Sequence, residues 1–157
     1  MVDLYVKYSG VGAGGSGESI EIENSIAKVN YADEACVSLL FQDKPTAAAV
    51  HPDIEECLRI KETSLESNVI ESLRTFILEC GFLNLDSIYG KKDKSGRAYS
   101  SVINVEIDTI KKTVTYLSSP EADPAPQAFV DVEQRLREMS DRIINDTSIT
   151  AIHESRD

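Results

Sequence analysis

The strongest pattern in the chain is an apolar stripe at helical spacing within residues 63–85. Its side chains recur at intervals of one or three residues, which places them on one side of an α-helix. Thr63 and Glu66 have the spacing of a capping box, and Gly81 suits the left-handed position after a helix. The pattern predicts one long helix that ends at Gly81 and packs its stripe against the core. The stripe contains Val69, Ile70, Leu73, Phe76, Ile77 and Cys80.

A second helix is predicted after the prolines at 120, 124 and 126, which interrupt regular structure. Apolar side chains then advance by three or four residues, which is the spacing of one helix face. We interpret this seam as a core face, and the alternative is a surface for a partner helix. The seam contains Phe129, Val132, Leu136, Met139 and Ile143.

Strands are predicted wherever apolar and polar residues alternate. This alternation occurs in residues 2–8, 18–23, 26–31, 102–107 and 112–117. The glycine-rich residues 9–17 are expected to join the first two strands as a long antiparallel hairpin tip, and the second strand resumes at residue 26 after a turn at residues 24–25. The short connection at residues 108–111 requires another antiparallel hairpin. Residues 32–62 are ambiguous: the apolar run 36–41 favours a strand over a helical turn, and residues 53–60 have helical propensity after Pro52.

The order of elements is strand, strand, insert, helix, strand, strand, helix. Hairpins followed by helices predict an α+β fold, with an antiparallel sheet of four or five strands and two main helices on one face. A chain of 157 residues is long enough for one core. We therefore expect a single domain over residues 1–144 and a flexible tail over residues 145–157.

The charge of the chain restricts its partners. Sixteen basic and 27 acidic residues give a net charge of −11, which repels nucleic acid and anionic lipid. No apolar run is long enough to span a bilayer, and no secretion signal begins the chain. Cys36, Cys57 and Cys80 have no metal-binding spacing and are expected to be reduced core residues. These features predict a cytoplasmic protein.

Catalytic and metal motifs are matched only in part. Gly10-x-Gly12-x-x-Gly15 follows the dinucleotide pattern, but a strand instead of a helix is expected after it. Ser25 and Lys28 have the spacing of a serine–lysine pair but lie in strand-like sequence. Asp93 lies in a loop that lacks the end ligands of a calcium site. The two histidines, His51 and His153, are far apart. We therefore expect no catalytic residues, metal site or cofactor.

The glycine-rich stretch of residues 9–17 is the main candidate contact site. It holds five of the eight glycines, and ordering such a loop costs conformational entropy, so a fold that retains it is expected to use it. The second candidate is the polar loop of residues 91–97, and for both loops the alternative is a tolerated surface loop. The predicted partner-binding residues are Gly10, Val11, Gly12, Ala13, Gly14 and Gly15.

Several features together resemble emfourins, which are small cytoplasmic inhibitors of thermolysin-like metalloproteases. The features are Ser9-Gly10 ending a strand, the segment Cys80-Gly81-Phe82-Leu83-Asn84-Leu85 after a helix, a tyrosine before a strand hairpin with Lys-Thr-Val, and a proline before the final helix. The resemblance covers residues 2–17 and 63–143. The insert at residues 32–62 and the longer tail depart from it.

Three functions follow as hypotheses. The favoured one is a non-enzymatic protein-binding module, with a thermolysin-like metalloprotease as the partner that the resemblance implies. The second is an enzyme or small-ligand carrier with a cleft beside residues 32–62. The third is a structural subunit that forms homo-oligomers through apolar surface on the final helix.

Overall fold

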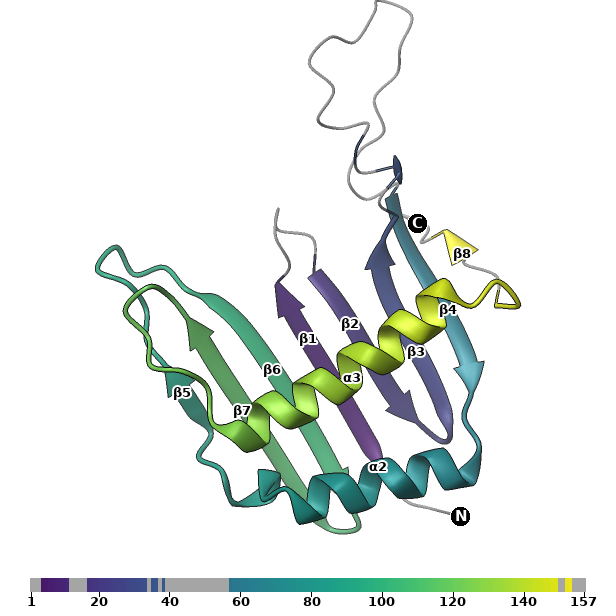
Figure 1. Cartoon of the computed structure of the whole chain (residues 1–157), viewed down its shortest axis with the longest axis horizontal. Coiled ribbons are helices and arrows are strands. Elements are labelled where there is room, and N and C mark those ends of the chain that lie inside the picture. Colours follow the sequence, from purple (N-terminus) through teal and green to yellow (C-terminus); the bar gives the residue numbers. More distant parts are fainter. Residues whose placement is uncertain are drawn as a thin grey trace, which may run out of the picture.

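The computed structural model describes residues 4–11, 17–33, 35, 36, 38, 57–149 and 152–153. These residues form an α+β fold with one sheet and two main helices (Figure 1). The elements are β1 (Tyr5–Val11), β2 (Gly17–Glu23), β3 (Ile26–Ala32), β4 (Leu58–Ser64), α2 (Ser67–Glu79), the 3-10 helix η2 (Phe82–Asn84), β5 (Ile88–Gly90), β6 (Tyr99–Ile107), β7 (Ile110–Ser118), α3 (Gln127–Asn145) and β8 (Ile152–His153).

Within the described ranges the sheet has eight strands in the order β5-β7-β6-β1-β2-β3-β4-β8. All neighbours are antiparallel except β5 and β7, which are parallel. The α+β class is therefore confirmed. The prediction of four or five antiparallel strands is wrong in number and misses the parallel pair. β5 and β8 are too short to show alternation, and β4 lies where a helix was expected.

The alternating segments form the strands that they predict, and one side of each faces the core. Asn24 and Ser25 both have positive φ angles, 52° and 66°, as the turn of a two-residue hairpin of type I′ requires. The hairpin of β6 and β7 is also confirmed. The buried strand residues include Val6, Tyr8, Ile20, Ile22, Ala27, Val29, Ile103, Val105, Ile107 and Val114.

The first predicted helix is shorter than expected. α2 begins at Ser67, and Thr63 instead pairs with Ala27 between β3 and β4, so the capping box is wrong. Val69 is 39% exposed, whereas Ile70, Leu73 and Ile77 are buried. Gly81 adopts the predicted left-handed conformation, with φ 87°, and the chain then enters η2, where Phe82 is buried.

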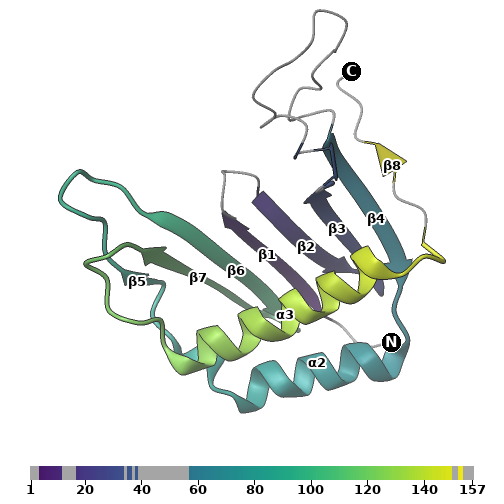
Figure 2. The ribbon, with the colours of Figure 1, turned by 45° about the horizontal axis from the view of Figure 1, so that its top comes forward.

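α3 turns its seam toward the core. Phe129, Val132, Leu136 and Ile143 are buried, and Met139 packs partly against the same core. Figure 2 shows α2 and α3 side by side on one face of the sheet. The core-face interpretation of this seam is therefore confirmed.

β4 corrects the prediction of a helix up to residue 60, since Leu58–Ile60 are strand residues. Its alternation is inverted, because Lys61 pairs with buried Val29 and is itself only 7% exposed. The Lys61 ammonium donates hydrogen bonds to the carbonyl oxygens of Ile144 and Asp146, at 2.5 and 3.3 Å. A lysine on the core side thus concealed the strand, and it caps the C-terminal end of α3.

Two further expectations fail around β4. Cys36 and Cys57 form a disulfide with a Cα–Cα distance of 5.4 Å, so they are not reduced core residues, while Cys80 is a free, half-buried thiol. Ala35, Cys36 and Ser38 are helical, so the favoured strand is wrong there; the rest of residues 37–56, including His51, lies outside the described residues. In the expected tail, Ile152 pairs with Ile60 as part of β8.

Candidate functional site

The glycine-rich stretch joins the two central strands of the sheet. β1 pairs with β6 on one side and with β2 on the other (Figure 1). The ladder between β1 and β2 extends to the pair Val11 and Gly17, so the ends of the expected loop belong to strands. Of the predicted contact residues, Gly10 and Val11 lie in β1, whereas Gly12, Ala13, Gly14 and Gly15 lie outside the described residues.

Gly10 is a strand residue with a close neighbour. It pairs with Glu18 of β2 and with Ser101 of β6. A β-carbon at this position would stand 2.6 Å from the hydroxyl oxygen of Tyr8, which is closer than real β-carbons approach other heavy atoms. A larger residue here would have to displace the Tyr8 side chain, so limited space favours glycine at this strand position.

Tyr8 connects the base of this hairpin to α3. Its side chain is 4% exposed, and its hydroxyl donates a hydrogen bond to Oε2 of Glu133 at 2.9 Å. The hydroxyl oxygen of Tyr8 also accepts a hydrogen bond from Nε of Arg137 at 3.0 Å. Glu133 and Arg137 are four residues apart on α3, and a second guanidinium nitrogen lies 4.0 Å from the Glu133 carboxylate. The three side chains form one polar network under the hairpin.

The protonation of this network follows from its surroundings. Burial is the main cause that raises the pKa of Tyr8 above 10.0; the Glu133 charge adds to it and the hydrogen bond from Arg137 opposes it. The hydrogen bond with Tyr8 raises the pKa of Arg137, and the charges of Glu133 and Glu18 act in the same direction. At neutral pH Tyr8 is thus a neutral donor and Arg137 a cation, which is the arrangement that all their contacts need.

Comparison with known proteins identifies no family for this chain. No family model matches the chain, and no curated protein matches it in sequence. The contacts of the described residues are therefore the basis for a functional proposal.

Other candidate chemistry finds no assembled site in the described part of the chain. No group of three or more His, Cys, Asp or Glu side chains there could hold a metal ion. Ser25 lies in a turn and Lys28 in β3, so they are not aligned on a helix. The glycine-rich stretch leads into β2, as predicted, and not into the helix N-terminus that a dinucleotide site needs. In the described part of the chain, neither α2 nor α3 is long and apolar enough to cross a lipid bilayer.

The sequence does not predict the polar network of Tyr8, Glu133 and Arg137. Tyr8 is 125 residues from Glu133, and only the fold brings β1 against α3. The one local signal is the pair Glu133 and Arg137, whose spacing places both on one helix face. Such pairs are common on exposed helices, so that signal does not identify this site.

Proposed function

We propose that this protein is a non-enzymatic protein-binding module that contacts its partner through the tip of the β1–β2 hairpin. The observation that carries the proposal is the network of Tyr8, Glu133 and Arg137, which fixes the base of the hairpin to α3. The network and the β1–β2 ladder hold Val11 and Gly17, the two ends of the glycine-rich connection, at a defined place on the sheet. Fixing the base also reduces the conformational entropy that binding must remove.

The class of partner rests on the resemblance to emfourins. On the basis of this resemblance, we propose that the partner is a thermolysin-like metalloprotease that the hairpin tip inhibits. The net charge of −11 favours a partner with a basic rim, and it disfavours nucleic acid and anionic membranes. No cofactor takes part in this function.

The test is a titration of a thermolysin-type protease with the full chain and with a variant that lacks residues 12–15. We expect the full chain to reduce peptidase activity, and the variant to lose this effect while its melting temperature stays unchanged. Glu71→Ala, an exposed change on α2, is the control and should inhibit like the parent. Inhibition that survives the deletion would overturn the role of the tip, and absence of inhibition by the full chain would overturn the protease as partner.

The location of the protein is also a proposal. The sequence predicts the cytoplasm, where thiols are normally kept reduced. The Cys36–Cys57 disulfide instead favours an oxidising compartment. Fractionation of native cells, with the cysteines alkylated before lysis, would decide between the two locations.

A further inference from the structure

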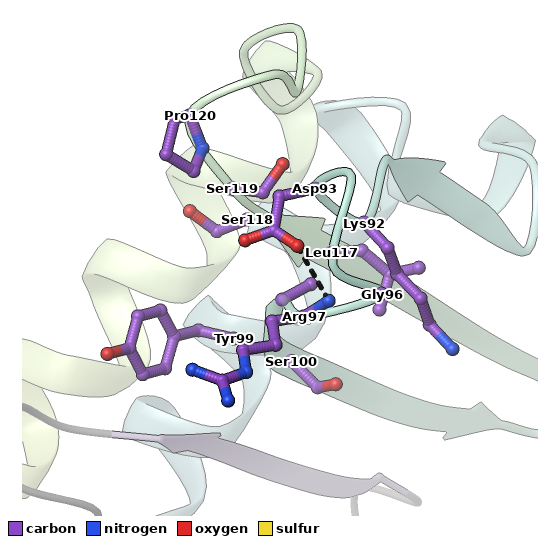
Figure 3. A pocket seen from close by; sticks show the side chains of 11 residues that line it. Lys92, Asp93, Gly96, Arg97, Tyr99, Ser100, Leu117, Ser118, Ser119 and Pro120 are labelled. Carbon is purple, nitrogen blue, oxygen red and sulfur yellow. Dashed lines mark hydrogen bonds between the residues drawn. The ribbon is translucent and has the colours of Figure 1, made fainter.

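A second feature, independent of the hairpin, is a cavity of about 760 Å³ at one end of the sheet. It lies between the β5–β6 loop, the start of β6 and the segment that follows β7 (Figure 3). Its volume falls within the range of small-ligand sites, roughly 300–1,000 Å³. Tyr99 and Arg97 line it on one side, and Ser118 and Ser119 line it on another.

The loop that forms this cavity has a fixed shape. The carboxylate of Asp93 accepts hydrogen bonds from the backbone N–H and the hydroxyl of Ser95, at 2.9 and 2.6 Å, and from the backbone N–H of Arg97, at 2.9 Å. These bonds, with that from the Ser95 hydroxyl first, lower the pKa of Asp93 below 3.8. The Ser119 hydroxyl donates to the carbonyl oxygen of Lys91 and ties the loop to the opposite wall. The cavity therefore exists before any ligand arrives.

The charge of this loop is opposite to that of the chain. Lys91, Lys92, Lys94 and Arg97 lie within seven residues that contain one acid, although the whole chain carries −11. Within the described residues, no salt bridge engages the side chains of Lys92 or Arg97. Arg97 and Tyr99 both line the cavity (Figure 3), and Tyr99 is 63% exposed. A cation and an aromatic surface are thus both available to a ligand.

We propose that this cavity binds a compact oxyanion, the carboxylate or phosphate group of a small molecule, with Arg97 as its main anchor. A guanidinium group offers paired N–H donors that match both oxyanions. Lys92 adds positive charge from another side of the cavity, and the Tyr99 ring supports an apolar or planar part of the ligand. The ligand is compact because the negative charge of the rest of the protein repels a long polyanion, whereas over a few ångströms, less than the screening length of about 8 Å, the local cations dominate.

Arg97 can be tested without changing the loop. Arg97 contacts Asp93 through its backbone, since its N–H donates to the Asp93 carboxylate and its carbonyl oxygen accepts from the Asp93 N–H at 2.8 Å. Arg97→Gln therefore removes the guanidinium group and leaves both hydrogen bonds in place. Lys94→Gln is the matched control, because it removes the same charge from the same loop and Lys94 does not line the cavity.

The experiment is a titration followed by ¹H–¹⁵N NMR, at constant ionic strength, with inorganic phosphate in one arm and benzoate in the other. We expect saturable shifts of the backbone amides of residues 93–99 and 117–119 in at least one arm, and the two arms distinguish phosphate from carboxylate. Arg97→Gln should weaken that affinity roughly tenfold or more, as the loss of a charge-assisted hydrogen bond implies. Lys94→Gln should change it less than about threefold, since an exposed charge contributes little. Shifts that do not saturate in either arm, or equal losses in both variants, would overturn the proposal.

Discussion

The hydroxyl oxygen of Tyr8 lies 2.6 Å from the point where a β-carbon on Gly10 would stand. Both residues belong to β1 and face the same side of the sheet, so the conformation of one limits the size of the other. Because the hydroxyl is also held by Glu133 and Arg137, it has little freedom to move away.

Gly10→Ala should therefore destabilise the protein by about 1–3 kcal/mol, the usual cost of overpacking. Equilibrium unfolding in urea would measure this change. In a Tyr8→Phe background the same substitution should cost less, because the oxygen that meets the β-carbon is absent. Equal costs in the two backgrounds would show that the Tyr8 hydroxyl does not require glycine at this position.

The stability of the protein should fall progressively as the pH rises above 10. Burial, assisted by the hydrogen bond to Glu21, raises the pKa of Tyr5 to about 12, and burial also raises the pKa of Tyr8 and of Tyr31 above 10.0. Between these values the unfolded chain loses protons that the folded chain keeps, so stability is complete below pH 10 and falls as the pH rises toward 12. Denaturant unfolding at several pH values would measure this fall, and Tyr5→Phe should make it shallower. Constant stability from pH 9 to pH 12 would contradict the prediction.

Lys61→Met should cost about 1.5–3 kcal/mol, the range for a hydrogen bond to a charged group. The methionine keeps the apolar stem but leaves the carbonyl oxygens of Ile144 and Asp146 without the ammonium donor. Thermal unfolding would measure the loss, and amide hydrogen exchange should speed up most in the last turn of α3. Lys28→Met is the control, since Lys28 lies on β3 with its side chain on the opposite face and should contribute little. The same loss in both variants would contradict a specific role for Lys61.

The cysteines give a chemical test of the fold. Alkylation of the unfolded protein without reductant should modify Cys80 alone, and alkylation after reduction should modify all three cysteines. Replacing Cys36 and Cys57 by alanine should lower the free energy of unfolding by about 3 kcal/mol, the loop-closure value for a separation of 21 residues. Mass spectrometry would count the alkylated cysteines, and unfolding in urea would measure the change in the free energy of unfolding. Three modified cysteines without reductant would show that the bond is absent.

Local patterns in the sequence predict the individual helices and strands. The alternation of Ile20 and Ile22 placed β2, and the spacing from Phe129 to Ile143 placed the buried side of α3, because period 2 and period 3.6 are set by the backbone of each element alone. The α+β class followed from the order of these elements. The glycine-rich hairpin was also located correctly, although not the reason for Gly10.

Contacts between residues distant in the chain emerge only when the elements pack together. In the sequence Lys61 resembles a surface residue, but in the structure it lies beside the end of α3. Cys36 and Cys57 are predicted as separate thiols, but in the structure they form a disulfide at the start of β4. Tyr8 reads as one more strand residue until α3 crosses β1. The contacts of Lys61 and Tyr8 are fixed by the packing of α3 on the sheet, and the Cys36–Cys57 bond lies where β3 pairs with β4. Periodicity shows which side of an element is buried, but not which distant element it meets.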